Sequence, residues 1–172
     1  MVRKMASMSL QHFKTFLGIT DQHTQKFERK DYDLIYLDMA NELANASHDF
    51  NTKIGCIAVK NNRIIAAGLN GFPPGSNDHL LPNRRVNDDD LKLNCMNHAE
   101  ENMIFDAARR GISLEGSTIY ITAKPCKNCA KALVSVGIRK WVLGRKQFKE
   151  SELDAAWREF WIKMFNVEIK YV

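Results

Sequence analysis

The chain has 172 residues, of which 45% are hydrophobic and 9% aromatic. This is enough to bury one sizeable core, so we expect a single compact domain. The formal charge of +5 favours an anionic partner such as a nucleotide, but no long basic block predicts a nucleic-acid surface, and we consider nucleic acid an unlikely partner.

Neither the start of the chain nor any later segment has the apolar run of a secretory signal or a membrane span. We therefore expect a soluble, cytoplasmic protein with no membrane partner. Four cysteines, two of them in a C-x-x-C motif, fit a metal or redox site better than a disulfide framework.

Residues 1–30 are polar except for a short stripe whose spacing predicts one helix. The stripe consists of Leu10, Phe13, Phe16 and Leu17. We expect residues 1–30 to form an N-terminal extension that packs on the core or on a neighbouring subunit. The folded domain is expected to cover residues 31–172.

The domain is expected to begin with a helix from Tyr32 to about His48, capped by Asp31. Its predicted buried side consists of Leu34, Ile35, Leu37, Met39, Ala40 and Leu43. Two β-branched runs follow, at 53–60 and 63–69. They are joined by Asn61-Asn62, a pair that tolerates the positive φ of a tight hairpin.

Residues 70–97 contain several glycines and prolines, which predict a long loop with a substrate-covering or interface role. A helix from Glu100 to Arg110 should follow, ended by Gly111. Its expected inward residues are Met103, Ile104, Ala107 and Ala108.

Strands and helices alternate in the remainder of the chain. The strands are expected at Ser117–Ala123, Lys140–Leu143 and Val167–Val172, and the helices at Cys126–Val136 and after Ser151. Single helices between strands imply parallel pairing. The fold class is therefore α/β, a three-layer α/β/α arrangement with a mixed five-stranded sheet. Trp157, Phe160 and Trp161 of the last helix suit either the core or an interface.

Two motifs carry the chemistry, His98-Ala99-Glu100 and Pro125-Cys126-Lys127-Asn128-Cys129. Together, H-x-E and P-C-x-x-C are the signature of zinc deaminases that act on nucleobases. His98, Cys126 and Cys129 would hold one catalytic Zn²⁺ and leave the fourth tetrahedral position to water. Glu100, beside the metal, would carry protons as general base and then general acid.

Other interpretations of these residues remain open. Without the upstream motif, C-x-x-C is also typical of a thioredoxin-like redox pair. Cys95 is a possible fourth ligand, which would close the site to water. His48, His79, Cys56 and Cys95 are possible ligands of a second zinc, although Cys56 is most simply a small core residue.

Beyond these motifs, the chain resembles the deoxycytidylate (dCMP) deaminase family of the zinc-dependent cytidine deaminase superfamily, from about residue 33 to the C-terminus. Besides the zinc motifs, the resemblance rests on residues 51–55, 68–73 and 81–85. It implies deamination of dCMP to dUMP and ammonia, which supplies the precursor of dTMP, and a homo-oligomer that is commonly a hexamer.

The resemblance also implies residue roles. Asn70, at the sugar, and Ala99 are expected to bind substrate. Arg109, Arg84 and Arg85 are candidates for contacts with its phosphate, because a guanidinium group matches phosphate oxygens. Gly68, Asn70 and Gly71 are possible contacts of dCTP and dTTP, allosteric effectors bound with Mg²⁺. The family usually has Tyr at the position of Leu69.

Two other functions compete with dCMP deamination. A tRNA adenosine or other nucleobase deaminase would use the same metal ligands, but should carry a basic, aromatic-lined surface. A noncatalytic, zinc-stabilised binding or assembly subunit would not need Glu100.

Overall fold

The computed structural model describes residues 9–16, 18, 31–77, 79 and 91–172. The chain divides into two compact units, residues 1–30 and 31–172. The first contains helix α2 (Leu10–Phe16). The side chains of its predicted apolar stripe, at Leu10, Phe13, Phe16 and Leu17, lie outside the described part of the structure.

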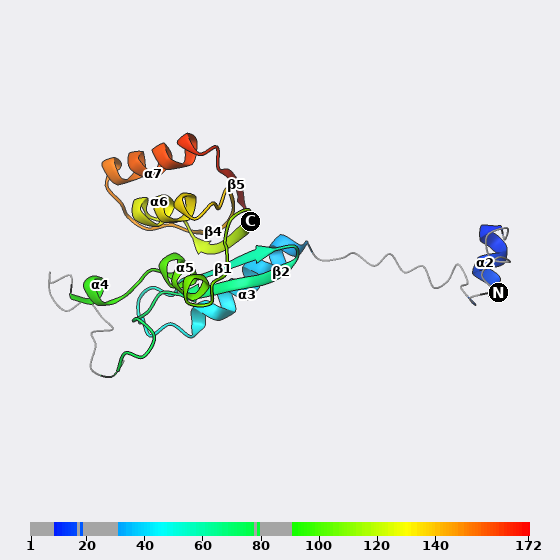
Figure 1. Ribbon diagram of the computed structural model, residues 1–172, viewed down its shortest axis with the longest axis horizontal. Coiled ribbons are helices and arrows are strands. Elements are labelled where there is room, and N and C mark those ends of the chain that lie inside the picture. The colour runs from blue at the N-terminus through cyan, green and yellow to red at the C-terminus, as the bar shows by residue number, and fades with distance from the viewer. Residues whose placement is uncertain (1–8, 17, 19–30, 78, 80–90) are drawn as a thin grey trace. The chain divides into compact units, whose positions relative to one another are not determined.

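The second unit is built on one five-stranded sheet in the order β2-β1-β3-β4-β5 (Figure 1). Its strands are β1 (Gly55–Lys60), β2 (Arg63–Leu69), β3 (Thr118–Ala123), β4 (Lys140–Lys146) and β5 (Glu168–Tyr171). β1 is antiparallel to β2 and β3, whereas β3, β4 and β5 are parallel. The predicted mixed sheet is confirmed.

Helices cover both faces of this sheet. They are α3 (Tyr32–Asn45), α4 (Leu91–Cys95), α5 (Ala99–Arg109), α6 (Lys127–Ser135) and α7 (Glu152–Met164). Alternate residues of the strands point to opposite faces. Ile119 and Ile121 share a core with α5, α6 and α7, whereas Tyr120 and Val142 pack against α3. The result is the expected three-layer arrangement (Figure 1).

Most predicted boundaries follow from local chemistry. Asp31 and Ser151 cap α3 and α7 by accepting from the backbone N–H of Asp33 and Asp154. Asn61 and Asn62 take φ of 53° and 59°, as a tight hairpin between β1 and β2 requires. Helix α4 was not predicted, and it interrupts the expected loop. Residues 78 and 80–90 of that loop, with Arg84 and Arg85, lie outside the described residues.

The predicted burial of two helices is wrong in part. Leu34 and Met39 of α3 are exposed, and the buried side instead includes Tyr36 and Ala44. Ala108 of α5 is also exposed. Apolar spacing marks a helical stripe but does not fix which edge of the stripe meets the sheet. In the described part of the chain, no helix combines the length and apolar character needed to cross a membrane.

Candidate active site

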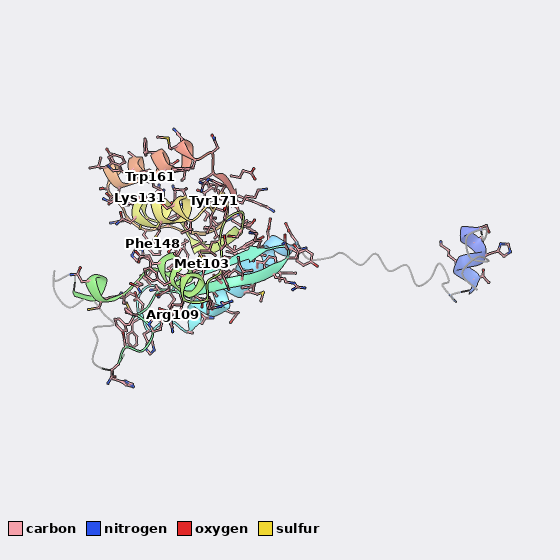
Figure 2. The ribbon with its side chains drawn as sticks, viewed as in Figure 1. Met103, Arg109, Lys131, Phe148, Trp161 and Tyr171 are labelled. Atoms are coloured by element: carbon pink, nitrogen blue, oxygen red, sulfur yellow. The ribbon has the colours of Figure 1, made fainter. Side chains whose placement is uncertain are left out.

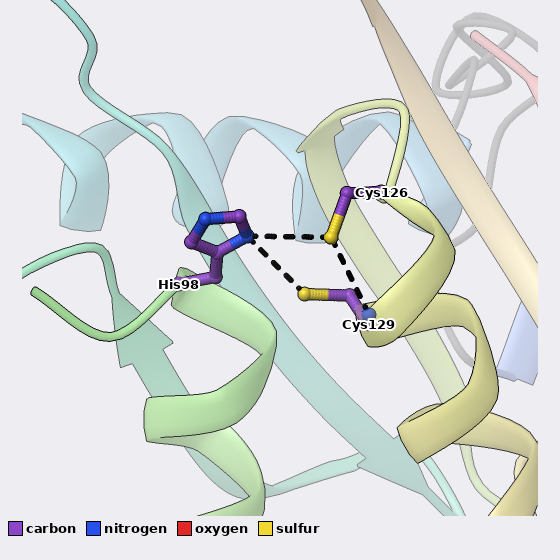
Figure 3. Close-up of side chains that lie close together, drawn as sticks. All are labelled: His98, Cys126 and Cys129. Carbon is purple, nitrogen blue, oxygen red and sulfur yellow. Dashed lines mark hydrogen bonds between the residues drawn. The ribbon is translucent and has the colours of Figure 1, made fainter. Parts of the chain in front are cut away.

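Three potential metal ligands meet where α5 and α6 begin (Figure 3). His98 Nδ1 lies 3.6 Å from Cys126 Sγ and 3.3 Å from Cys129 Sγ. Nitrogen and sulfur ligands of one tetrahedral zinc ion are about 3.5 Å apart, given usual bond lengths. The donor set and its spacing therefore fit zinc with these three residues as ligands.

Each ligand is positioned by the start of a helix. His98 is the N-cap of α5, and Cys126 is the N-cap of α6, where its sulfur accepts from Cys129 N at 3.4 Å. The unpaired N–H groups and positive end of a helix favour anionic sulfur at this place. The P-C-x-x-C spacing puts both thiols on the first turn.

Contacts within the cluster favour a thiolate at Cys126. Hydrogen bonding from Cys129 lowers the pKa of Cys126 to about 4. The hydrogen bond to Cys126 raises the pKa of His98 to about 9. The same sulfur contact, together with burial, raises the pKa of the Cys129 thiol. A coordinated zinc ion would reverse this last shift, since a thiol that binds the metal loses its proton.

Glu100 lies beside this cluster without belonging to the ligand group. Its side chain is buried and faces the cavity, with the Cys129 thiol as a hydrogen-bonding neighbour. Burial raises the pKa of Glu100 from 4.5 to about 7. A carboxyl group with a pKa close to neutral can both accept and return a proton, as a general acid and base must.

The chain that leads to His98 is fixed by contacts that the sequence did not reveal. Gly71 and Asn97 exchange two backbone hydrogen bonds, of 3.1 and 2.9 Å. Asn102, one turn into α5, donates to the Leu69 carbonyl at 2.8 Å and accepts from the Asn97 side chain at 3.0 Å. These bonds attach the start of α5 to the end of β2, which sets the position of the imidazole.

Gly68 allows that attachment because α5 packs directly on its backbone. A Cβ atom at Gly68 would lie 2.3 Å from both Ala99 O and Met103 N. Gly71 differs, since its Cβ would meet only Leu69 Cδ1 at 3.4 Å. The structure thus gives Gly68 a packing role, next to the substrate-binding candidate Ala99.

A cavity of about 650 Å³ opens onto the cluster at the carboxyl ends of β3 and β4. Ligands of parallel sheets commonly bind at such ends. One wall comes from residues 123–126, 147–150 and α7, and includes Phe148, which is 51% exposed (Figure 2). This volume lies within the range of small-molecule sites.

The opposite wall is organised by Asp49 and Asn70. Asp49 accepts from the backbone of Asn51 and Thr52 at 2.8 and 3.0 Å, and pairs with Lys92. The Asn70 side chain accepts from Ile54 N at 2.8 Å and donates to Thr52 O and to Asp49. Asp49 and Lys92 are not among the predicted site residues, because an isolated charge is normally expected on the surface.

The structure brings most, but not all, of the proposed site residues together. Asn70, Ala99 and Glu100 line the cavity with His98 and Cys126. Arg109 does not, because it is exposed in the last turn of α5, whose first turn carries the site (Figure 2).

The alternative metal ligands do not join the cluster. Cys95 is absent from the ligand group, so it does not close the site. Cys56 is fully buried in β1, as expected of a core residue. Among the described residues, His48, His79, Cys56 and Cys95 form no second group of metal ligands.

A mixed sheet between helices, with a His/Cys/Cys group beside a buried glutamate, defines a zinc-dependent deaminase of the type that acts on nucleobases. Residues 30–145 match the model of the cytidine and deoxycytidylate deaminase zinc-binding region. The chain therefore belongs to this family.

Individual relatives agree with this assignment. An uncharacterized deaminase of Aliivibrio fischeri is 37% identical over 61% of this chain and 67% of its own length. Mouse deoxycytidylate deaminase is 33% identical over 67% of this chain, and the match spans 65% of the mouse protein. The apo crystal structure of cyanophage S-TIM5 dCMP deaminase has a TM-score of 0.64 and 25% identity, over 84% of this chain and all of that one.

Proposed function

We propose that this protein hydrolyses the exocyclic amine of dCMP and releases dUMP and ammonia, as a step toward dTMP. The observation that carries the proposal is the convergence of His98, Cys126 and Cys129 beside the buried Glu100 at the cavity. The choice of dCMP rests on the resemblance to deoxycytidylate deaminases of mouse and cyanophage.

The metal ligands, Glu100 and the cavity walls have separate roles in this reaction. Zinc held by the three ligands would supply a water of lowered pKa. Glu100 takes a proton from the attacking water and delivers it to N3 of the ring. It then takes a second proton, from the hydroxyl group formed at C4, and delivers that proton to the departing amine. Its raised pKa suits both directions of transfer. The cavity walls hold the ring next to Glu100.

Asn70 and Ala99 remain candidates for substrate binding because both line the cavity. The Asn70 amide already makes three hydrogen bonds within the protein. Its remaining capacity is one oxygen lone pair, which suits a sugar hydroxyl. Arg109 is not proposed to bind substrate, because it does not line the cavity. Lys124, Lys149 and Arg158 line the wall near α7 and are candidates for a phosphate contact, but Lys124 and Arg158 already pair with Glu159 and Glu150. Lys149 is therefore the candidate to test.

The test is a deamination panel with the zinc-loaded protein. Cytidine, deoxycytidine, CMP, dCMP, dCTP and 5-methyl-dCMP are compared with a tRNA anticodon stem-loop, and products are separated by chromatography. We expect dCMP to give the highest kcat/KM. Turnover of the RNA alone would establish the tRNA deaminase alternative, and no turnover of any substrate would favour the noncatalytic subunit.

Regulation and assembly are further parts of the proposal, and they rest on the family resemblance. We propose a cytoplasmic homo-hexamer, with residues 1–30 as an extension of the domain, that is activated by dCTP and inhibited by dTTP with Mg²⁺. Repeating the panel with each triphosphate tests the regulation. Among the suggested effector contacts, Gly68 already has a packing explanation, so Asn70 and Gly71 are the positions to test.

A further inference from the structure

The side-chain amide of Asn70 is held by bonds from the segment between α3 and β1. Its oxygen accepts from Ile54 N at 2.8 Å, and its nitrogen donates to Thr52 O at 2.7 Å and to Asp49 Oδ2 at 3.3 Å. Both protons of the nitrogen are therefore used, whereas one of the two lone pairs of the oxygen remains. If the amide turned over, its oxygen would face two acceptors and its nitrogen would face a donor. The bonds thus fix one orientation, which offers a ligand an acceptor but no donor.

Asp49 controls this orientation both directly and through the loop. Besides meeting Asn70, its carboxylate accepts from Asn51 N at 2.8 Å and from Thr52 N at 3.0 Å. These bonds place the Thr52 carbonyl, which is the second acceptor for the Asn70 amide. The Ser47 hydroxyl also donates to the backbone carbonyl of Asn70 at 2.6 Å and accepts from Asp49 N at 3.1 Å. Asp49 and Asn70 are therefore held to each other at both backbone and side chain.

Lys92 of α4 keeps Asp49 in the form that accepts hydrogen bonds. Its Nζ lies 2.5 Å from Asp49 Oδ2, the same oxygen that faces the Asn70 amide, and both charged side chains are buried. A carboxyl group buried without a cation takes up a proton instead of keeping its charge. The protonated oxygen would then be a donor and would no longer suit the Asn70 nitrogen. Lys92 therefore supports the orientation of Asn70 through Asp49.

We propose that Asp49 and Lys92 are positioning residues, which hold Asn70 as an acceptor-only contact and so select nucleotides with a free hydroxyl group on the sugar. In dCMP this group is the 3′-hydroxyl, because C2′ carries no hydroxyl and the 5′ oxygen carries the phosphate. A sugar without a proton to donate would leave the buried acceptor unsatisfied and would bind less well. This inference rests on the proposed function for the class of ligand, a deoxynucleotide in the cavity.

Nucleotide binding to the zinc-loaded Glu100→Gln protein tests the polarity of the contact, because substrate is then not consumed. Calorimetry compares dCMP with 2′,3′-dideoxy-CMP and with its 3′-fluoro derivative. We expect both analogues to bind at least about tenfold more weakly than dCMP, since fluorine can accept but cannot donate. Equal binding of dCMP and the 3′-fluoro analogue would overturn the proposal, and so would the absence of binding by all three.

Adding Asp49→Asn and Lys92→Met to this protein tests the two positioning residues. Both charges are removed together, so neither is left uncompensated, and the new amide oxygen can still accept from Asn51 N and Thr52 N. The atom that faces Asn70 changes from an acceptor to a donor. The preference for dCMP over 2′,3′-dideoxy-CMP should fall to about threefold or less. A purely structural defect would weaken both nucleotides alike and leave their ratio unchanged.

Asp106→Ala with Arg110→Met is the matched control. These residues form an ion pair of 2.7 Å on α5, and neither is among the described residues that line the cavity. This control should keep the tenfold preference. An unchanged preference after Asp49→Asn and Lys92→Met would overturn the positioning role, even if the wild type deaminates dCMP.

The outcome is separate from that of the substrate panel because binding is measured rather than turnover. A wild type that does not deaminate dCMP, combined with a sugar preference that depends on Asp49 and Lys92, would refute the proposed function and leave this inference standing. The 3′-fluoro comparison needs no change at either residue. It therefore decides the polarity of the contact even if the variant with both substitutions does not fold.

Discussion

Lys92 and Asp49 form an ion pair inside the protein, with Lys92 Nζ 2.5 Å from Asp49 Oδ2 and side-chain exposures of 6% and 5%. The pair joins α4 to the loop after α3 at the cavity wall. Removing one partner of a buried pair leaves the other charge desolvated and uncompensated. The same Asp49 carboxylate holds Asn51, Thr52 and Asn70 in place.

Replacing Lys92 with methionine should therefore lower the free energy of unfolding by about 3–5 kcal/mol. Urea denaturation measures this change. The control is Lys140→Met, because Lys140 pairs with Glu168 on the surface, where both side chains are more than half exposed. That variant should lose at most about 1 kcal/mol. Equal losses in both variants would contradict the importance of the buried pair.

Local sequence was sufficient for the metal ligands and for the sheet. H-x-E and P-C-x-x-C each begin a helix, and the alternation of helices and strands brings those two helix starts to one end of the sheet. The three candidate ligands could therefore be predicted once the two motifs were recognised as a pair. The caps Asp31 and Ser151 were predictable for the same reason, since each bonds to backbone two or three residues away.

The supporting network was not predictable, because its partners are distant in sequence and polar. Asp49 and Lys92 are separated by 43 residues, and each is tolerated inside only because of the other. Asn102 contacts the carbonyl of Leu69 across the boundary between α5 and β2. The residues that neighbour Asn102 or Lys92 in the sequence do not distinguish such a buried contact from a solvated side chain.

Glu100→Gln should reduce kcat for dCMP by at least about a hundredfold, because the amide cannot take and return a proton. Zinc content should stay at the wild-type value, since Glu100 is not among the ligands. Steady-state kinetics and metal analysis measure the two effects. Glu101→Gln is the control, as its amide oxygen can still accept from His98 N, which Glu101 does at 2.8 Å. An unchanged kcat in Glu100→Gln would refute the proton-transfer role.

Substitution of the cysteines should separate the metal ligands from the other thiols. Cys126→Ser and Cys129→Ser should each lose zinc and deaminase activity, because a three-ligand site cannot spare a donor. Cys95→Ser should retain both, as Cys95 lies outside the ligand group. Plasma mass spectrometry of purified proteins gives the zinc content. Loss of zinc from Cys95→Ser would show that the site has a fourth protein ligand.

Gly68→Ala should destabilise the protein by about 1–3 kcal/mol or more, because its methyl group would collide with the backbone of α5. Displacement of that helix should also reduce zinc binding through His98. Gly71→Ala is the control, since its methyl group meets only the end of a flexible side chain at 3.4 Å. Thermal unfolding and zinc content are compared. A stable Gly68→Ala with altered response to dCTP would favour the effector role over packing.

Stability in acid depends on an ion-pair contact between β5 and the start of α3. Lys170 Nζ lies 3.2 Å from Asp31 and 2.6 Å from Asp33. A hydrogen bond from the Asp33 backbone and the contact with Lys170 lower the pKa of Asp31 below its ordinary 3.8. The stabilisation linked to Asp31 is therefore present above pH 3.8 and is lost as the pH falls through the lowered pKa.

Lys170→Met should reduce Tm at pH 6, and the difference in Tm from the wild type should shrink below pH 3.8. Lys131→Met, at an exposed position of α6, should show no such pH-dependent difference. A Tm difference that stayed constant through the acid range would exclude Asp31 as the titrating partner.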